Sequence, residues 1–413
     1  MPVHTFAGPS LAQFEAAREV VNRVIQVTPM EPSRYLSNVL GSEVILKCEN
    51  LQRTGSYKLR GAYFRMSNLT PEERAKGVIA ASAGNHAQGV ALAARELGIK
   101  ATIFMPYGVA LPKLEATREY GAEVVLEGGI FNEALKAALA RVEETGATFI
   151  PPFDHHDVVT GQGTLGLEII EAIPDVDTVI VPIGGGGLIS GLASAIKQKA
   201  ATLGRTVKVI GIQAENAAAY PPSLAAGERV RVDVHPTIAD GIAVAIPGEL
   251  NFSIIKDAVD EVITVSEDDT AKALLMLLER AKLVVEPAGA VGVAAILAGK
   301  LKNTGKTVIV LSGGNIDPLL MQRIIAHGLA ASERYLKIRI SLPDRPGQLA
   351  RTAQLVADAN ANVVEVLHTR HGKFEISEVE LELHIETRGP EHRAEVIKKL
   401  RDEGYKVRIS DDI

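Results

Sequence analysis

An alternation of strand-like and helix-like segments between about residues 43 and 330 constrains the fold more than any other feature of this chain. Apolar, β-branched runs at residues 178–183 and 207–213 are typical of buried parallel strands. Shorter runs at residues 101–105 and 123–126 lead into helical patterns that end near residues 120 and 144. The alternation predicts an α/β fold with parallel sheets.

Charge and cysteine content exclude several classes of protein. A net charge of −6 over 413 residues, with lysine and arginine spread along the chain, argues against nucleic acid as a partner. The single cysteine, Cys48, excludes an internal disulfide and fits a reducing compartment. Residues 1–20 lack a basic start and an apolar core, and Pro182 and glycines break the uncharged stretch 178–196. We expect a cytoplasmic protein without a membrane span.

The clearest ligand-binding pattern is a run of four glycines before a helical pattern at residues 188–197. Backbone N–H groups without Cβ atoms at a helix N-terminus form a cup for phosphate. The dinucleotide motif G-x-G-x-x-G fits in no register, because Ile189 and Ser190 stand where its third glycine is required. No Gly-Lys-Ser/Thr follows either. A monophosphate is therefore the expected ligand, with a ligand-free tight turn as the alternative, and the cup consists of Gly184, Gly185, Gly186 and Gly187.

Two further strand-to-helix turns carry small polar residues. The first follows the apolar run at residues 78–81 and reads Ser-Ala-Gly-Asn-His, over residues 82–86. Such a helix N-terminus suits a carboxylate or a ring hydroxyl, although His86 by itself fits a packed or capping histidine better. The second, residues 307–315, places Ser312 at the carboxyl end of a strand, where ligands of open α/β sheets sit.

Lys58 stands at a fourth junction of this kind. It lies between the strand-like residues 43–48 and the helix-like residues 60–68, in the stretch Ser-Tyr-Lys-Leu-Arg-Gly. A lysine at such a junction can point into a pocket and form a Schiff base with an aldehyde, of which pyridoxal phosphate (PLP) is the commonest in biology. Taken alone, a solvated helix lysine is the simpler interpretation.

Five motifs occur in an order that resembles one enzyme family. They are SYKLRGA, SAGNHAQG, PPFD with GQGT, GGGGLISG and SGGN, and they cover about the first four-fifths of the chain. The order resembles the fold-type II PLP enzymes, in particular the threonine dehydratases and their serine dehydratase and serine racemase relatives. This resemblance implies a tryptophan synthase β-like catalytic domain over residues 1–330, with a small lobe of about residues 50–155 inserted in a large lobe.

The resemblance also implies a role for each motif residue. Lys58 would hold PLP as an imine and later remove the Cα proton of the substrate. Tyr57 would lie beside the cofactor ring, where the family more often has Phe. Asn85 would bond the ring hydroxyl, Ser312 the ring nitrogen, and the four glycines the phosphate. The remaining implied contacts are Leu188 and Gly313 for the cofactor, and the backbone of Ser82, Ala83, Gly84, Asn85 and His86 for the substrate carboxylate.

The implied reaction is the conversion of L-threonine to 2-oxobutyrate and ammonia, with L-serine as a secondary substrate. A serine racemase is one alternative, but racemases of the family carry serine where this chain has Ala83. A lyase for serine or hydroxyaspartate is a second alternative. A non-catalytic amino-acid sensor is a third, and the presence of Lys58, Asn85 and Ser312 argues against it.

The pattern changes after about residue 333. Strand-like segments at 335–341, 362–369, 378–386 and 405–410 and helical segments at 349–360 and 390–403 predict a βαββαβ, ferredoxin-like layout. With the stretch LPDRPGQLA, residues 334–413 resemble an ACT domain, a regulatory module that binds amino acids at paired interfaces. The implied effector is isoleucine or valine in a homodimer or homotetramer, with a ligand-free dimerisation module as the alternative. The expected effector contacts are Asp344, Pro346, Gly347, Gln348, Leu349 and Asn362, completed by a second chain.

No metal site is expected from the sequence. Racemase relatives bind a cation near the positions of Glu215 and Ala219, but Pro221 replaces their second acid. His155 and His156 are adjacent rather than four residues apart, which is poor geometry for zinc.

Overall fold

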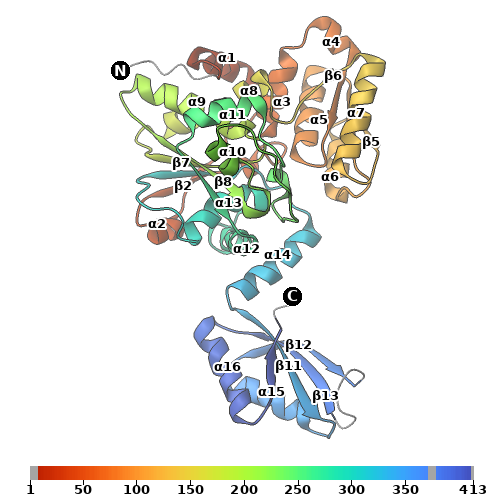
Figure 1. Cartoon of the computed structure of the whole chain (residues 1–413), viewed down its shortest axis with the longest axis vertical. Coiled ribbons are helices and arrows are strands. Elements are labelled where there is room, and N and C mark those ends of the chain that lie inside the picture. The colour runs from red at the N-terminus through yellow and green to blue at the C-terminus, as the bar shows by residue number, and fades with distance from the viewer. Residues whose placement is uncertain (1–7, 371–377, 411–413) are drawn as a thin grey trace. The chain divides into compact units, whose positions relative to one another are not determined.

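The computed structural model describes residues 8–370 and 378–410, which fall into two compact units, Met1–Pro318 and Leu319–Ile413. The expectation that residues 1–20 are not a leader segment falls partly on residues 1–7, which lie outside the described residues. The first unit has two lobes that lie side by side, each built on its own sheet (Figure 1). No helix in the described part of the chain is long and apolar enough to cross a membrane.

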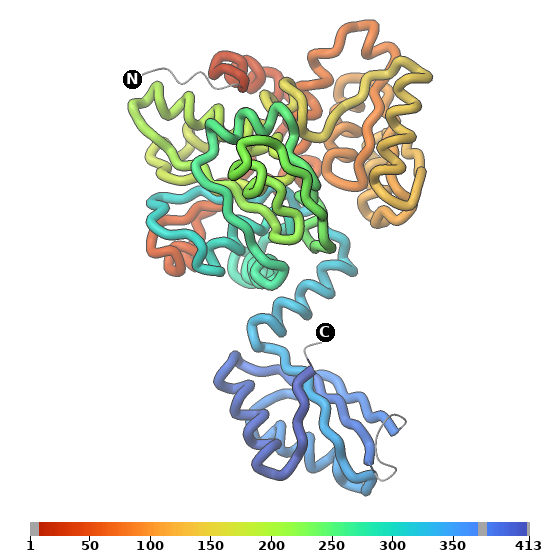
Figure 2. Tube along the Cα trace, in the orientation of Figure 1, coloured from red at the N-terminus to blue at the C-terminus, as the bar shows by residue number. Residues whose placement is uncertain are grey.

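The large lobe is built on a six-stranded sheet in the order β1-β2-β10-β7-β8-β9. All neighbours are parallel except β1 and β2. Early and late segments of the chain lie side by side in this lobe, because β10 pairs with β2 (Figure 2). The strands are β1 (Met30–Pro32), β2 (Val44–Lys47), β7 (Thr178–Pro182), β8 (Lys208–Ala214), β9 (Glu261–Val265) and β10 (Thr307–Val310).

Helices cover this sheet and enclose an extensive hydrophobic core. Phe14 packs α1 onto α8 and α9 of the large lobe. Helices α8 and α9 approach closely, since a Cβ on Gly166 would lie 2.7 Å from the Leu192 carbonyl oxygen. The helices are α1 (Leu11–Val21), α2 (Arg34–Leu40), α8 (His156–Ala172), α9 (Gly187–Thr202), α10 (Tyr220–Ala226), α11 (Glu249–Ala258), α12 (Glu267–Met276) and α13 (Pro287–Leu297), with short turns η1 (Glu49–Leu51), η2 (Glu215–Ala217), η3 (Asp240–Ile242) and η4 (Leu277–Ala281).

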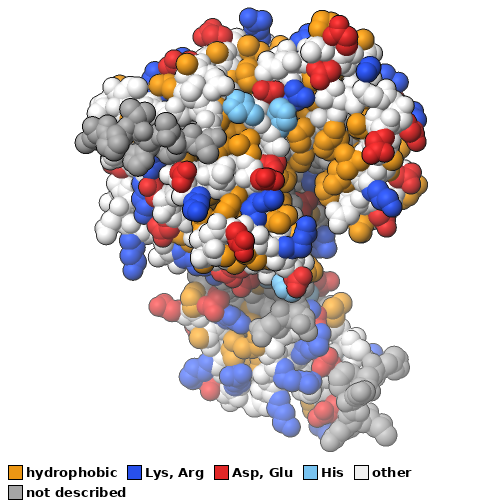
Figure 3. All heavy atoms as spheres, turned by 45° about the horizontal axis from the view of Figure 1, so that its top comes forward, with side chains coloured by type: hydrophobic (Ala, Val, Ile, Leu, Met, Phe, Trp, Pro, Cys, Tyr) orange, Lys and Arg blue, Asp and Glu red, His pale blue; other side chains and the backbone are white. Residues whose placement is uncertain are grey.

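The small lobe is formed by the chain between η1 and α8. Its parallel sheet has the order β5-β4-β3-β6. Its strands are β3 (Val78–Ala81), β4 (Ala101–Met105), β5 (Glu123–Leu126) and β6 (Thr148–Phe149), and its helices are α3 (Lys58–Ser67), α4 (Pro71–Lys76), α5 (Asn85–Leu97), α6 (Leu111–Glu119) and α7 (Phe131–Thr145). Charged side chains of both signs are dispersed over the face drawn in Figure 3 rather than gathered by sign.

The second unit contains an antiparallel sheet in the order β12-β13-β11-β14, packed through a separate core against α15 and α16. The predicted α/β class and the ferredoxin-like βαββαβ layout are both confirmed. The unit division assigns most of α14 to this unit, and the domain boundary at residues 330–334 stays a prediction. The elements are α14 (Pro318–Ala331), β11 (Tyr335–Pro343), α15 (Gln348–Asp358), β12 (Asn362–Thr369), β13 (Glu378–Glu386), α16 (Pro390–Asp402) and β14 (Val407–Ile409).

Candidate active site

A cavity of about 390 Å³ lies in the first unit, at the carboxyl ends of strands from both lobes. The turns that follow β3, β7 and β10 all contribute to it, together with the start of α3. The structure thus brings together residues that are far apart in the sequence. From the predicted cofactor and substrate set, the cavity is lined by Tyr57, Lys58, Ser82, Ala83, Gly84, Asn85, His86, Gly184, Gly185, Gly186, Gly187, Leu188 and Ser312.

Gly313 is the one member of that set that does not line the cavity. It pairs with Ser56 in an isolated antiparallel bridge just behind the wall. A Cβ at Gly313 would clash with the carboxylate of Glu286, so the glycine leaves room for that side chain. Its effect on the site is therefore indirect.

The glycine loop presents unused donors to the cavity. Within the described part of the chain, the backbone N–H groups of residues 184–189 have no acceptor. The Gly185 carbonyl is held from behind by the Tyr220 hydroxyl at 3.1 Å and the Asn251 amide at 3.0 Å. Gly186 has a φ of +100°, and a Cβ there would clash with the Tyr220 hydroxyl. The loop is a fixed cradle for an anion at the N-terminus of α9.

Lys58 meets this cradle from the small lobe. Its Nζ donates to the carbonyl of Pro152 at 2.8 Å and lies 5.4 Å from the centre of the Tyr57 ring. Desolvation lowers the pKa of Lys58 to about 8, despite the opposing charge of Glu286. A lysine with this pKa is partly neutral near physiological pH, which a nucleophile or a base requires. Desolvation raises the pKa of Tyr57, so its phenol stays neutral.

Glu286 was not found from the sequence. Its carboxylate accepts a 2.6 Å bond from Nδ2 of Asn85, and Nδ2 of Asn315 donates to the other end of the same amide at 2.8 Å. Burial and the negative charge of Asp240 raise the pKa of Glu286 to about 7. The two bonds fix the orientation of the Asn85 amide and leave one N–H free for a ligand. The available signal was an acid inside the apolar run of residues 283–297.

His86 is a packed histidine rather than an acid or base. Its Nε2 lies 2.8 Å from the Ile150 carbonyl, and its side chain is buried. Burial and the charge of Lys58 lower the pKa of His86 to about 3, so the ring is neutral and donates to that carbonyl. Backbone N–H groups of Ala83, Asn85 and His86 have no acceptor among the described residues. The turn can therefore receive a carboxylate through its backbone.

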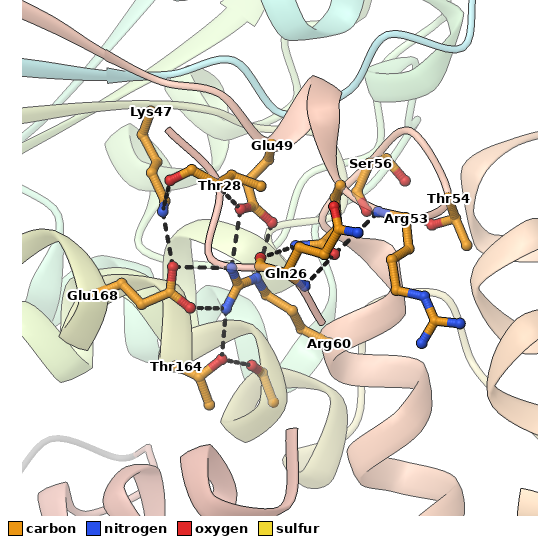
Figure 4. Close-up of polar contacts among 12 residues, drawn as sticks. Gln26, Thr28, Lys47, Glu49, Arg53, Thr54, Ser56, Arg60, Thr164 and Glu168 are labelled. Carbon is orange, nitrogen blue, oxygen red and sulfur yellow. Dashed lines mark hydrogen bonds and ion pairs between the residues drawn. The ribbon is translucent and has the colours of Figure 1, made fainter. Parts of the chain in front are cut away.

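A second group of buried charges lies behind the start of α3 (Figure 4). Arg60 is fully buried and binds Glu49 at 2.8 Å and Glu168 at 2.6 Å, while Lys47 binds Glu168 at 2.8 Å. Thr164 adds a hydroxyl contact to the guanidinium. This Arg60 cluster, made of Lys47, Glu49, Arg60 and Glu168, ties α3 to β2 and α8 of the large lobe. Neither its geometry nor its members could be read from the sequence.

The predicted effector residues are only partly brought together in the second unit. Asp344 to Gly347 form the turn between β11 and α15, and Gln348 and Leu349 open α15; Gly347 has a φ of +89°. Asn362 pairs with Glu386, which also pairs with Tyr335 at the start of β11. Asn362 therefore lies at the opposite end of the sheet from the turn. The other end of β12 is the near one, since Arg370 contacts Asp344 at 3.4 Å.

The residues considered for metal binding have other partners. Glu215 forms an ion pair of 3.1 Å with Lys300. Nδ1 of His155 accepts from the backbone N–H of Asp157 and caps α8. Among the described residues, no cluster of three or more histidine, cysteine or acidic side chains could hold a metal ion.

A family model described as pyridoxal-phosphate dependent enzyme matches residues 21–313. The chain belongs to this family. A second family model, the ACT domain, matches residues 337–403. The predicted cofactor class and the resemblance to an ACT domain are both confirmed, and the free donors of the glycine loop, Asn85, Ser312 and Lys58 fit PLP.

Curated relatives place the chain more closely. It is 50% identical to the L-threonine ammonia-lyase of Thermotoga maritima over 97% of this chain and 99% of that protein. It is 47% identical to the L-threonine ammonia-lyase of Geobacter sulfurreducens over 96% of this chain and 98% of the relative. The catabolic L-threonine dehydratase TdcB of Escherichia coli K12 is 47% identical and covers 73% of this chain and 92% of its own length.

Solved structures confirm the predicted fold-type II architecture. The processed form of threonine deaminase isoform 2 from Solanum lycopersicum superposes with a TM-score of 0.72 at 39% identity, over 79% of this chain and 96% of that one. Maize serine racemase superposes with a TM-score of 0.72 at 33% identity, over 79% of this chain and 99% of that one. The resemblance to PLP-dependent threonine dehydratases is thus confirmed across nearly the whole chain.

Proposed function

We propose that this chain deaminates L-threonine to 2-oxobutyrate and ammonia by eliminating water, with L-serine as a secondary substrate. One observation carries the proposal: Lys58, whose pKa is lowered to about 8, shares a cavity with two helix N-termini that have free backbone donors. The first such end fits a phosphate and the second a carboxylate. An amino acid whose Cα lies beside Lys58 satisfies all three groups.

The chain's own residues would hold PLP in a defined way. The N–H groups of the glycine loop would bind its phosphate, the free N–H of Asn85 its ring hydroxyl, and Ser312 its ring nitrogen. Lys58 would bind its aldehyde carbon. When bound, PLP supplies an electron sink for negative charge that develops at Cα. A hydroxyl opposite the ring nitrogen, unlike a carboxylate, does not hold that nitrogen protonated.

Lys58 supplies the base. Its amine, freed when the substrate binds, is neutral often enough at pH 7–8 to take the Cα proton, because its pKa is about 8. Loss of the β-hydroxyl as water then leaves an enamine acid, which hydrolyses to 2-oxobutyrate and ammonia. The Pro152 carbonyl, 2.8 Å from Nζ, keeps the amine directed into the cavity.

A direct assay tests the activity. Purified protein with PLP is expected to release 2-oxobutyrate from L-threonine faster than pyruvate from L-serine at equal concentrations. Absence of oxo acid from threonine would overturn the proposal. Formation of D-serine as the main product would favour a racemase, an activity that Ala83 opposes because its side chain cannot carry a proton to the other face of Cα.

We further propose that residues 334–413 regulate a catalytic domain of residues 1–330 in a cytoplasmic homodimer or homotetramer that serves isoleucine synthesis. The support is the matching ACT family model and the open edge of β12, where Val364 and Leu367 are 57% and 46% exposed. An unpaired edge with apolar side chains is a template for a second strand. A second copy of β12 would complete the effector site at the turn of residues 344–347 and the start of α15.

A truncation, a substitution and a binding measurement test the regulation. Truncation near residue 332 should leave threonine deamination intact and abolish the response to isoleucine or valine, which in the whole protein should be a coupling of about 1–3 kcal/mol. Gly347→Val should also abolish it. Gly404→Val is the matched control, because both glycines have positive φ, +89° and +88°, and open space around the Cβ position. Calorimetry that detects no bound amino acid would instead favour a ligand-free dimerisation module.

A further inference from the structure

Lys113 and Asp240 face each other across the mouth of the cavity. Lys113 lies in the first turn of α6 in the small lobe, and Asp240 opens η3 in the large lobe. Both line the cavity, and their side chains form an ion pair of 3.4 Å between Nζ and Oδ2. Neither residue belongs to the motifs from which the catalytic set was predicted.

The two partners differ in exposure. The side chain of Lys113 is 17% exposed, whereas that of Asp240 is 62% exposed. Ion pairs with such an exposed partner contribute little, because water and salt screen them. The Lys113 ammonium therefore loses little free energy when it leaves Asp240 and binds another carboxylate that is better shielded from water.

The position of Lys113 identifies that other carboxylate. Its Nζ lies 3.9 Å from the place where a Cβ of Gly84 would stand, directly beside the turn whose backbone N–H groups are free. Among the described residues that line the cavity, Lys58 and Lys113 are the two that carry an ammonium group, and Lys58 is committed to the cofactor and Cα. A charge-assisted bond from Lys113 would add to the weaker attraction of the helix N-terminus.

We infer that Lys113 binds the α-carboxylate of the amino-acid substrate and that Asp240 holds its ammonium in place while the cleft is empty. This inference rests on the proposed function, because it assigns a further contact to the same substrate. It also predicts that the site rejects an amine without a carboxylate more strongly than neutral backbone donors alone would. An amine that carries the threonine side chain but lacks the carboxylate would lose the contact with Lys113.

The test compares Lys113→Gln, Lys113→Arg and Asp240→Asn as holoenzymes. Lys113→Gln should raise KM for L-threonine about ten- to hundred-fold with a smaller change in kcat, the range expected for a lost bond between charged groups. It should leave the inhibition constant of L-threoninol, which has a hydroxymethyl group in place of the carboxylate, unchanged. Lys113→Arg should restore most of the affinity. Asp240→Asn should keep KM at or below the wild-type value.

Lys136→Gln is the matched control, because Lys136 is an exposed lysine on α7 of the same lobe. Equal weakening of threonine and threoninol by Lys113→Gln would mean a merely structural role and would overturn the inference. An unchanged KM in Lys113→Gln, while the wild-type enzyme does deaminate threonine, would overturn it as well and would leave the proposed function standing. A wild-type protein inactive on threonine would overturn both.

Discussion

Two groups of buried charges lie at the start of α3, and they are built in opposite ways. In the Arg60 cluster every cation has a carboxylate within 2.8 Å. In the cavity, Lys58 donates to the carbonyl of Pro152 and to no other group among the described residues, and Glu286 accepts from the amide of Asn85. Lys58 and Arg60 are two positions apart in the sequence, yet their environments differ. Carboxylates neutralise the charge of Arg60 by pairing with it, whereas Lys58 donates to a carbonyl group.

The difference appears in the direction of each pKa. Burial opposes the charge of Arg60 and Glu168, but their contacts with each other and with neighbouring charges raise the pKa of Arg60 and lower that of Glu168. In the cavity, desolvation dominates, lowering the pKa of Lys58 to about 8 and raising that of Glu286 to about 7. Paired charges hold the lobes together, whereas unpaired groups with shifted pKa values are available for chemistry.

Loss of the Lys58 amine should have the largest effect. Lys58→Ala is expected to lower turnover of threonine at least about 10³-fold, because both the covalent link to PLP and the base are removed. Borohydride reduction and peptide mapping should find PLP attached at residue 58 in the wild type and in the control Lys136→Ala. A label on the same peptide of Lys58→Ala, or turnover near the wild-type rate, would refute the assignment.

Breaking the paired cluster should act on stability instead. Arg60→Met leaves Glu49, which is fully buried, without its cation and should cost about 3–5 kcal/mol of unfolding free energy. Arg18→Met is the control, because its pair with Glu171 has partners that are 23% and 44% exposed, and its loss should cost less than about 1 kcal/mol. Denaturant unfolding measures both. Equal costs would mean that burial does not distinguish the two pairs.

Glu286→Gln should change how stability depends on pH. The folded-state pKa of Glu286, about 7, lies above its ordinary value of 4.5, so between these values the unfolded chain loses a proton that the folded chain keeps. Wild-type stability should therefore fall as pH rises through this window, by about 2–4 kcal/mol relative to Glu286→Gln. Unfolding of the cofactor-free protein at both ends of the window tests this. The exposed Glu72→Gln should leave the wild-type dependence in place.

Ser312→Ala should have the smallest effect. Its hydroxyl is expected to make one hydrogen bond to the ring nitrogen, worth about 0.5–1.5 kcal/mol, or roughly two- to twelve-fold in kcat/KM. Ser194→Ala removes a buried hydroxyl that has no partner among the described residues and serves as the control. Unchanged kinetics and unchanged cofactor absorbance in Ser312→Ala would place the residue away from the ring.

The cofactor and substrate residues predicted from the sequence stand in turns that follow strands or at the start of the next helix. Lys58, Asn85 and Ser312 could be predicted because local chemistry marks such turns and because parallel strands bring their carboxyl ends together. The hydrogen bond between Asn85 and Glu286 joins residues 201 positions apart, and no local sequence pattern predicts it. The Arg60 cluster depends in the same way on contacts across two lobes.

The second unit shows the same limit. Its strands were predicted within a few residues, because alternation of apolar and polar side chains sets both the extent and the buried face of a half-buried strand. The pairing order was not fixed by that pattern. Within one chain, strand register puts Asn362 at the far end of the sheet from the turn at Gly347, and the predicted effector site, which a second chain completes, stays a prediction.

Cys48 is the only cysteine in the chain, and it is buried in the large lobe. Burial raises the pKa of its thiol to about 12, so almost no thiolate is present for alkylation at neutral pH. A cysteine introduced at any exposed position would therefore react alone with a maleimide dye or a spin label. Two labels, one at an exposed position in each unit, would report the distance between the units. Adding threonine or a branched-chain amino acid would then show whether either ligand changes that distance.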